Sequence, residues 1–288
     1  MISRIARTFP ASVLNAKFLL LGPHGLQELR VQKHTRNIKF ASPFESEVRS
    51  EGPEDDANFG FGTLASFMFK HIIFDCDGVL VDSEPLSMEI DRDILAENGI
   101  VMTVAEVGAQ FIGLTFEDFI ERIESDYRIK LPADVSADKN RRLLALYEKK
   151  LAAAPGIHAT LAGIRLPMSV ASNSPRHRVE AAFRIAGLTS YFGDRIVTFE
   201  DVARAKPAPD IYLETARRAK VRPEACLAIE DSKAGVASAV TAGCMVIGFT
   251  GLAHDGAASA EALSRLGAKI VVERHADLPA AIAAVLKL

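Results

Sequence analysis

Short apolar runs alternate with stretches of helical periodicity along residues 69–83 and 155–288, and this alternation predicts strands and helices in turn. Short, mostly apolar runs predict strands buried on both faces; they are H-I-I-F, P-M-S-V-A-S, R-I-V-T-F, A-C-L-A-I-E, C-M-V-I-G-F and K-I-V-V. Elsewhere apolar residues recur every three or four positions, which predicts helices over 177–188, 209–219, 233–243 and 276–286. Such alternation implies a doubly wound, Rossmann-like α/β core, in which helices cover both faces of a parallel sheet.

Residues 84–154 interrupt this alternation, because they carry helix patterns and no strand pattern. The stretch P-L-S-M-E-I-D-R-D-I-L-A-E-N-G has one apolar side, Thr115 is a suitable N-cap for a second helix, and a third helix is predicted over 137–152. We therefore expect an all-helical cap domain, residues 84–154, inserted into a catalytic core formed by residues 67–83 and 155–288.

Residues 1–66 differ in composition from the rest of the chain. Their first acidic residue is Glu28 and the next is Glu45, whereas basic residues are spread through the same stretch. A basic, acid-poor N-terminus is typical of a transit peptide. The alternative is an extension with no role in the fold, since Met68 precedes the first predicted strand. In either case we expect this segment to be poorly ordered.

The overall composition excludes several classes of function. The 288 residues are 49% hydrophobic and 25% charged, which is typical of a globular protein. A net charge of −3 gives no basic field that would attract nucleic acid or an anionic membrane. No apolar run reaches the roughly 18–20 residues that span a bilayer. We therefore expect a cytoplasmic protein, or an organellar one if residues 1–66 are a transit peptide.

The cysteines and histidines give no sign of a redox or zinc site. The three cysteines are widely spaced and odd in number, which favours buried thiols in a reducing compartment; they are Cys76, Cys226 and Cys244. Several histidines stand before a strand or in predicted loops; they are His71, His158, His254 and His275. We expect these histidines at the surface.

Three predicted strands end in polar groups that a core would not favour. These are Asp75 and Asp77 after the first strand, Ser172 and Asn173 after the second, and Glu230 and Asp231 after the fourth. A further polar residue, Lys206, stands in the loop A-R-A-K-P-A-P-D after the third strand. Parallel strands place their carboxyl ends at one edge of the sheet, where ligands bind, so these groups should share one crevice. Side chains two residues apart in a strand face the same side, so Asp75 and Asp77 should address one substrate.

The chemistry of this set indicates a site for a phosphoryl group. Carboxylates at this density need a compensating cation, and oxygen ligands without nearby His or Cys suit Mg²⁺. Lys206 and Ser172 could hold phosphate oxygens, and Gly78 lets backbone N–H groups approach an anion closely. One acid of the pair Asp75 and Asp77 could attack phosphorus, while the other protonates the leaving oxygen and then activates water.

Four motifs in order resemble those of the haloacid dehalogenase superfamily of phosphotransferases, over about residues 69–288. They are D-C-D-G-V-L-V-D-S-E, V-A-S-N-S, K-P-A-P-D-I-Y and I-E-D-S-K-A-G. The helical insert is similar to the small cap of the β-phosphoglucomutase and phosphoglycolate phosphatase branch. The resemblance implies that Asp75 is the nucleophile that becomes an aspartyl phosphate. It also implies that Asp77 is the general acid and base, with its backbone carbonyl in the metal shell.

The resemblance further implies roles for the later motifs. Ser172 and Lys206 would hold the phosphoryl oxygens. The implied Mg²⁺ ligands are Asp75, Asp77, Glu230 and Asp231. The candidates for contact with phosphate or with the rest of the substrate are Gly78, Asn173, Thr115 and Phe116, the last two in the loop G-L-T-F of the expected cap.

Three positions, compared with the family that the chain resembles, narrow the expected function. Asp77 favours phosphate chemistry, because the dehalogenases that give the superfamily its name lack this second acid. Compared with β-phosphoglucomutase, this chain has Phe116 in place of a cap arginine and Ser87 in place of a histidine. Both differences favour a Mg²⁺-dependent phosphatase acting on a small phosphomonoester, such as a sugar, polyol or sugar-acid phosphate.

Two other functions stay open. A phosphosugar mutase is the alternative enzyme, and a phospho-aspartate signalling module is the third hypothesis, although the helical insert argues against the latter. For either the phosphatase or the mutase, the expected partner is a small phosphorylated metabolite, and we expect no binding to nucleic acid or to a membrane. The expected state is a monomer or weak dimer.

Overall fold

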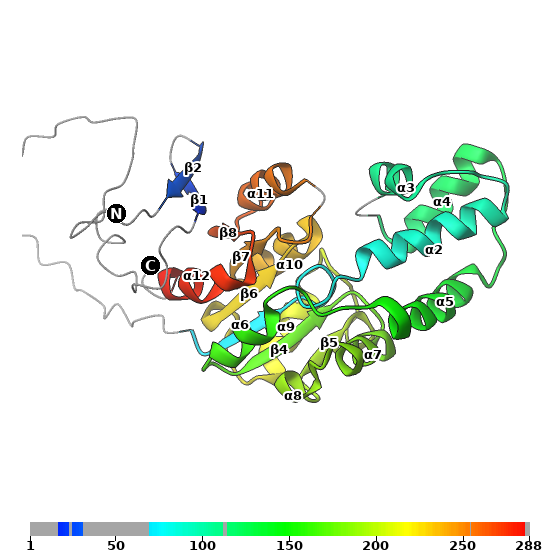
Figure 1. The fold of residues 1–288 in the computed structure, drawn as a ribbon. Coiled ribbons are helices and arrows are strands. Elements are labelled where there is room, and N and C mark those ends of the chain that lie inside the picture. The colour runs from blue at the N-terminus through cyan, green and yellow to red at the C-terminus, as the bar shows by residue number, and fades with distance from the viewer. Residues whose placement is uncertain (1–16, 23–24, 31–68, 112–113, 254, 286–288) are drawn as a thin grey trace, which may run out of the picture.

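The computed structural model describes residues 17–22, 25–30, 69–111, 114–253 and 255–285. Its described strands form one eight-stranded sheet in the order β2-β1-β8-β7-β6-β3-β4-β5, of which β3 to β8 are parallel (Figure 1). The parallel strands are β3 (His71–Phe74), β4 (Met168–Ser172), β5 (Ile196–Thr198), β6 (Cys226–Glu230), β7 (Met245–Phe249) and β8 (Ile270–Val272). The predicted α/β sheet is thus confirmed, strand by strand.

Helices cover both faces of this sheet, and adjacent residues of β3 show the two faces. Ile73 packs in a core cluster with residues of α9, α10 and α11, whereas Phe74 packs in a cluster with residues of α7, α8 and α12. The helices of the core are α6 (Ile157–Gly163), α7 (Arg176–Ala186), α8 (Thr189–Phe192), α9 (Asp210–Arg218), α10 (Lys233–Ala242), α11 (Gly256–Arg265) and α12 (Leu278–Val285). Burial on both faces explains why the strands read as continuous apolar runs.

A hairpin extends the sheet at an edge that the sequence pattern did not predict. β1 (Lys17–Gly22) and β2 (Gly25–Arg30) pair antiparallel with each other, and β1 pairs antiparallel with β8. Residues 1–66, which were expected to be poorly ordered, therefore contain these two strands. The remainder of that segment lies outside the described residues.

Four helices form the insert between β3 and α6. They are α2 (Glu84–Glu97), α3 (Val104–Phe111), α4 (Phe116–Tyr127) and α5 (Val135–Lys150), and they stand to one side of the sheet in Figure 1. We call residues 84–150 the helical insert. Thr115 caps α4 as expected, because its hydroxyl accepts a hydrogen bond from the backbone N–H of Asp118 (3.1 Å). The helix α3 was not predicted.

The chain enters and leaves the helical insert at the same place. Val81 and Ala153 form an antiparallel bridge. On either side of it, the backbone N–H of Ala154 donates to the carbonyl of Leu80 (2.9 Å) and that of Asp82 to the carbonyl of Ala152 (3.3 Å). A short two-stranded tether therefore joins the insert to the end of β3.

The cysteines lie in the core as predicted, but two histidines do not lie at the surface. All three cysteines are buried and unoxidised. His71 is buried within β3, where its Nε2 lies 2.8 Å from the hydroxyl of Ser169. His275 is buried as well; its Nε2–H donates to the carbonyl of Val79 (2.8 Å), and its ring stacks on Phe249. Among the described residues, every helix is too short or too polar to cross a lipid bilayer.

We predict that His275 by itself lowers the free energy of unfolding as pH falls from about 6.5 to about 4, while Asp75, whose pKa is raised to about 7, acts in the opposite direction. Burial lowers the pKa of His275 to about 4, whereas a histidine in the unfolded chain titrates near 6.5. In this window only the unfolded state takes up the proton, so acid favours unfolding, by about 3 kcal/mol across the full window. Urea denaturation at pH 7 and pH 5 measures the difference.

The matched variants for this measurement are His275→Gln and His158→Gln. Relative to the wild type, His275→Gln should be more stable at pH 5 than at pH 7 by up to the His275 contribution, whereas His158→Gln, at an exposed position, should show the same change as the wild type. An equal change between the two pH values in the wild type and in His275→Gln would contradict the lowered pKa of His275. The buried His71, whose pKa burial also lowers to about 4, accounts for a remaining dependence.

Candidate active site

The predicted site residues meet at the carboxyl ends of three neighbouring strands. Asp75 directly follows β3, Ser172 ends β4 and Glu230 ends β6, and β3 lies between the other two in the sheet. Lys206 reaches the same place from the loop between β5 and α9. The topology thus brings together residues that are up to about 155 positions apart, as the rule for parallel sheets requires.

Lys206 lies at the centre of this group. Its ammonium donates to Oδ1 of Asp75 (2.7 Å), to Oε1 of Glu230 (2.6 Å) and to the carbonyl of Ala171 (2.8 Å). The side chain of Lys206 is 3% exposed and that of Asp75 is 11% exposed. All three donors of the ammonium are therefore used, in a position shielded from water.

Burial and neighbouring charges set the ionisation of this cluster. Burial raises the pKa of Asp75; Lys206 opposes the rise, Glu230 and Asp77 add to it, and the result is a pKa of about 7. Burial alone would lower the pKa of Lys206, but the charges of Asp75 and Glu230 outweigh it and raise that pKa. One further cation beside Asp75 would therefore favour its ionised, nucleophilic form.

Two hydroxyl groups orient Asp77. Ser83 donates to its Oδ1 and Ser174 to its Oδ2, each at 2.5 Å, and Arg178 donates in turn to the hydroxyl of Ser174. The strand β3 ends at Phe74, so the turn after it, rather than strand alternation, directs Asp77. Both carboxylate oxygens of Asp77 are thus held in place, while the residue stays partly exposed.

Asp231 faces the turn that carries the two aspartates. A Cβ atom on Gly78 would lie 2.0 Å from Oδ2 of Asp231, and Gly78 has φ of +78°, so both space and backbone conformation require glycine here. Burial, together with the charges of Asp75 and Glu230, raises the pKa of Asp231, and Glu84 adds to this effect. Its Oδ1 is buried without a hydrogen-bond partner. Such an oxygen is suited to a cation.

The donor set fits a hard divalent cation. Among the described residues, Asp75, Glu230 and Asp231 each offer a carboxylate oxygen, and these oxygens lie within 4.8 Å of one another. An all-oxygen set of this kind is the one that Mg²⁺ prefers. The unpartnered Oδ1 of Asp231 supports the same assignment, because buried polar atoms without a partner are costly.

Glu230 is the most enclosed of these acids. Its Oε1 accepts from Lys206 and from the hydroxyl of Tyr212 (2.6 Å each), and its Oε2 accepts from the hydroxyl of Ser232 (3.2 Å). Gly235 allows this packing, since a Cβ there would lie 2.0 Å from the Glu230 carboxylate. Glu230 is therefore the buried counter-charge of Lys206, and its direct binding of a metal stays a prediction.

Ser172 and Asn173 shape the backbone around the cluster. The buried hydroxyl of Ser172 accepts from the N–H of Ser174 (3.0 Å). The amide of Asn173 accepts from the N–H of Lys206 (3.0 Å) and donates to its carbonyl (3.1 Å). Asn173 thus fixes the lysine loop through two hydrogen bonds. Contact of Ser172 or Asn173 with phosphate stays a prediction.

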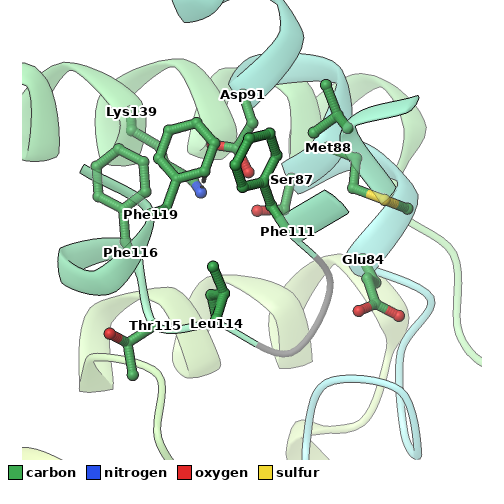
Figure 2. Close-up of a pocket in the computed structure, with 11 residues that line it drawn as sticks. Glu84, Ser87, Met88, Asp91, Phe111, Leu114, Thr115, Phe116, Phe119 and Lys139 are labelled. Carbon is green, nitrogen blue, oxygen red and sulfur yellow. Dashed lines mark ion pairs between the residues drawn. The ribbon is translucent and has the colours of Figure 1, made fainter. Parts of the chain in front are cut away.

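A pocket in the helical insert contains the two substrate-contact candidates. Thr115 and Phe116 line it, and Figure 2 shows the ring of Phe116 beside Lys139. Nζ of Lys139 lies 4.0 Å from the centre of this ring and forms an ion pair with Asp91 (2.6 Å). Gly113, which was expected in the same loop, lies outside the described residues.

Sequence reasoning missed several residues of this region. They are Ser83, Ser174, Arg178, Tyr212, Asp91 and Lys139. Ser83 and Ser174 stand within the quoted motifs, so their position was a usable signal. The ion pair of Asp91 and Lys139 joins α2 to α5, and a buried pair across two helices leaves no local pattern in the sequence.

Comparison with known proteins agrees with this geometry. A model of the family described as haloacid dehalogenase-like hydrolase matches residues 69–243. A curated relative, 6-phosphogluconate phosphatase of Escherichia coli strain K12, is 30% identical over 185 residues, which cover 64% of this chain and 84% of the relative.

Two solved structures are similar over most of their length. One is a conserved haloacid dehalogenase-like protein of unknown function from Agrobacterium tumefaciens, with a TM-score of 0.69 and 37% identity over 75% of this chain and 99% of that chain. The other is a HAD-family hydrolase from Deinococcus radiodurans R1 with bound phosphate and sodium, with a TM-score of 0.63 and 34% identity over 76% and 97%.

Proposed function

The chain belongs to the haloacid dehalogenase-like hydrolases, and on this basis we propose that it is a Mg²⁺-dependent phosphatase that hydrolyses a small phosphomonoester through an aspartyl phosphate. One observation carries the proposal: Lys206 holds one oxygen of Asp75 beside an Asp77 that two hydroxyls orient. A nucleophile and an acid with separate supports are what a two-step phosphoryl transfer needs.

In the first step Asp75 acts as the nucleophile. Lys206 engages Oδ1, so the other carboxylate oxygen attacks phosphorus, forming a new P–O bond while the ester P–O bond breaks. Asp77 donates its proton to the leaving oxygen, which departs as an alcohol. In the second step Asp77 takes a proton from water as the water oxygen attacks phosphorus. Inorganic phosphate leaves and the Asp75 carboxylate is restored.

A Mg²⁺ ion fits the site beside these residues. Asp75 and Asp231 would hold it, with the backbone carbonyl of Asp77 as the family resemblance implies. When bound, the ion would offset the negative charge of the phosphoryl group and of the clustered acids. The raised pKa of Asp75 supports this role, because a neighbouring cation favours the ionised carboxylate.

In the proposed mechanism, the helical insert faces the non-reacting part of the substrate. Its pocket adjoins the catalytic acids, since Glu84 lines the pocket and its charge acts on Asp231. We propose that the insert is a cap that covers the non-reacting part of the substrate and excludes water from the phosphoryl group. The relative named 6-phosphogluconate phosphatase supports a phosphorylated carbohydrate as the substrate class.

A phosphate-release assay with a panel of sugar, polyol and sugar-acid phosphates tests the proposal. Steady release of inorganic phosphate from at least one ester, in the presence of Mg²⁺, is the expected result. If instead the purified protein isomerises a sugar phosphate after priming with a bisphosphate and releases little phosphate, the mutase alternative replaces the phosphatase. A stable phospho-protein without turnover would favour the signalling alternative.

We expect removal of divalent cations to abolish turnover and Asp231→Asn to raise the Mg²⁺ concentration needed for half-maximal activity. The amide keeps the shape of Asp231 but removes the charge that would hold the cation, so the increase should be about tenfold or more. Phosphate release is measured against Mg²⁺ concentration after treatment with EDTA. Asp255→Asn, far along the chain at the N-cap of α11, is the control and should leave the curve unchanged. Full activity in EDTA would contradict the metal assignment.

A further inference from the structure

The pocket of the helical insert combines a buried ion pair with aromatic walls. Asp91 on α2 and Lys139 on α5 are buried residues whose side chains are only 13% and 10% exposed, and their charged atoms lie 2.6 Å apart. The rings of Phe111, Phe116 and Phe119 gather around them in Figure 2. An acceptor, a donor and flat apolar faces stand together in one concave site.

Charged groups around Lys139 already compensate its charge. Two carboxylates, Asp91 and Glu117, and one further cation, Arg178, act on Lys139 electrostatically. Counting Lys139 itself, two cations oppose two carboxylates. The ammonium also lies 4.0 Å from the centre of the Phe116 ring, a second favourable contact for its charge. Among the described residues that act on Lys139, no surplus positive charge is therefore left for an anionic group of a ligand.

From this geometry we infer that the pocket binds the uncharged, hydroxylated carbons of the substrate, and that Asp91 and Lys139 select them against a second anionic group. A carboxylate such as Asp91 accepts hydrogen bonds from hydroxyls, an ammonium donates to them, and aromatic faces pack on C–H surfaces. A carboxylate or second phosphate on the substrate would instead meet Asp91 at close range, where like charges repel.

This inference rests on the proposed phosphatase function and narrows its substrate class. Among phosphorylated carbohydrates, it favours a neutral sugar or polyol monophosphate over a sugar-acid phosphate or a bisphosphate. The reacting phosphate stays with Lys206 and the acids at the strand ends, and Glu84 marks the border between the two regions because it lines the pocket and acts on Asp231.

Three substrates with the same carbon number test the inference in the full-length protein. They are sorbitol 6-phosphate, 6-phosphogluconate and glucose 1,6-bisphosphate, with p-nitrophenyl phosphate as a general probe of phosphatase activity. We expect kcat/KM for sorbitol 6-phosphate to exceed that for each of the other two by about tenfold or more. Activity on p-nitrophenyl phosphate with a preference for 6-phosphogluconate or the bisphosphate would overturn the inference and leave the phosphatase function intact. Lack of activity on all four would instead overturn the function.

Variants of the ion pair separate selectivity from general damage. Asp91→Asn removes one of the two carboxylates that act on Lys139 and leaves a surplus of positive charge, so the preference for sorbitol 6-phosphate over 6-phosphogluconate should fall by about tenfold. Arg141→Ala changes an exposed cation on the same helix and should keep the wild-type ratio. Phe116→Leu, which keeps the pair, should weaken kcat/KM for sorbitol 6-phosphate while p-nitrophenyl phosphate turnover changes less. If folded Asp91→Asn keeps the wild-type ratio of kcat/KM for sorbitol 6-phosphate to that for 6-phosphogluconate, the inference is wrong. If Asp91→Asn does not fold, equal losses of kcat/KM for sorbitol 6-phosphate and for p-nitrophenyl phosphate in Phe116→Leu would contradict the inference instead.

Discussion

Asp75→Asn should reduce phosphate release by on the order of 10⁴-fold or more while the protein stays folded. The amide keeps the shape of the side chain and can still accept the hydrogen bond from Lys206, but it has no anionic oxygen with which to attack phosphorus. Steady-state phosphate release measures the loss. Acid quenching followed by intact-mass measurement should show a phosphorylated chain in the wild type and none in the variant.

A matched control for this variant is Asp194→Asn. Asp194 is an exposed aspartate in the turn before β5, and its replacement makes the same chemical change away from the site. It should retain wild-type turnover, and both variants should melt within a few degrees of the wild type, since in Asp75→Asn the amide fills the same volume and Lys206 keeps Glu230 as its buried counter-charge. Turnover of more than about a tenth of wild type in Asp75→Asn would rule out Asp75 as the nucleophile.

Lys206→Met should cause the largest loss of stability among single replacements at the site, about 3–5 kcal/mol, together with loss of turnover. Methionine fills a similar volume but leaves Asp75 and Glu230 as buried acids without their cation. Removing one partner of a buried ion pair costs more than the pair contributes, because the other charge stays desolvated. Urea denaturation at pH 7 measures the free energy of unfolding.

Two comparisons make the Lys206 result specific. Lys269→Met, at an exposed position before β8, should change the free energy of unfolding by less than about 0.5 kcal/mol. The loss in Lys206→Met should shrink as pH falls from 7 to 5, because protonation removes the uncompensated charge of Asp75, whose pKa burial already raises to about 7. A loss that is equal at both pH values would show that the cost comes from packing rather than charge.

The sheet and the strand-end acids could be predicted from the sequence because each leaves a local pattern. Strands such as Met168–Ser172 are buried on both faces and so read as apolar runs, and polar residues at their ends stand out against those runs. Asp75, Glu230 and Asp231 were predicted in this way, and the structure brings them together. Their meeting in one site was predictable because parallel topology places the carboxyl ends of all strands at one edge of the sheet.

The features that were missed depend on contacts between distant segments. His71 and His275 looked like surface residues because a lone histidine near a strand or loop carries no sign of burial; their partners are Ser169 and the carbonyl of Val79. The hairpin at the sheet edge depends on pairing with β8, whose register no local pattern records.

The two-stranded tether has an evolutionary consequence. Because Val81 and Ala153 face each other across the bridge, the helical insert occupies the chain as a loop with adjacent ends. A shorter, longer or differently folded loop could be spliced between these two points without shifting the register of β3 against β4 or β6. Selection can therefore exchange the substrate-facing module of such a protein and leave its chemical centre unaltered.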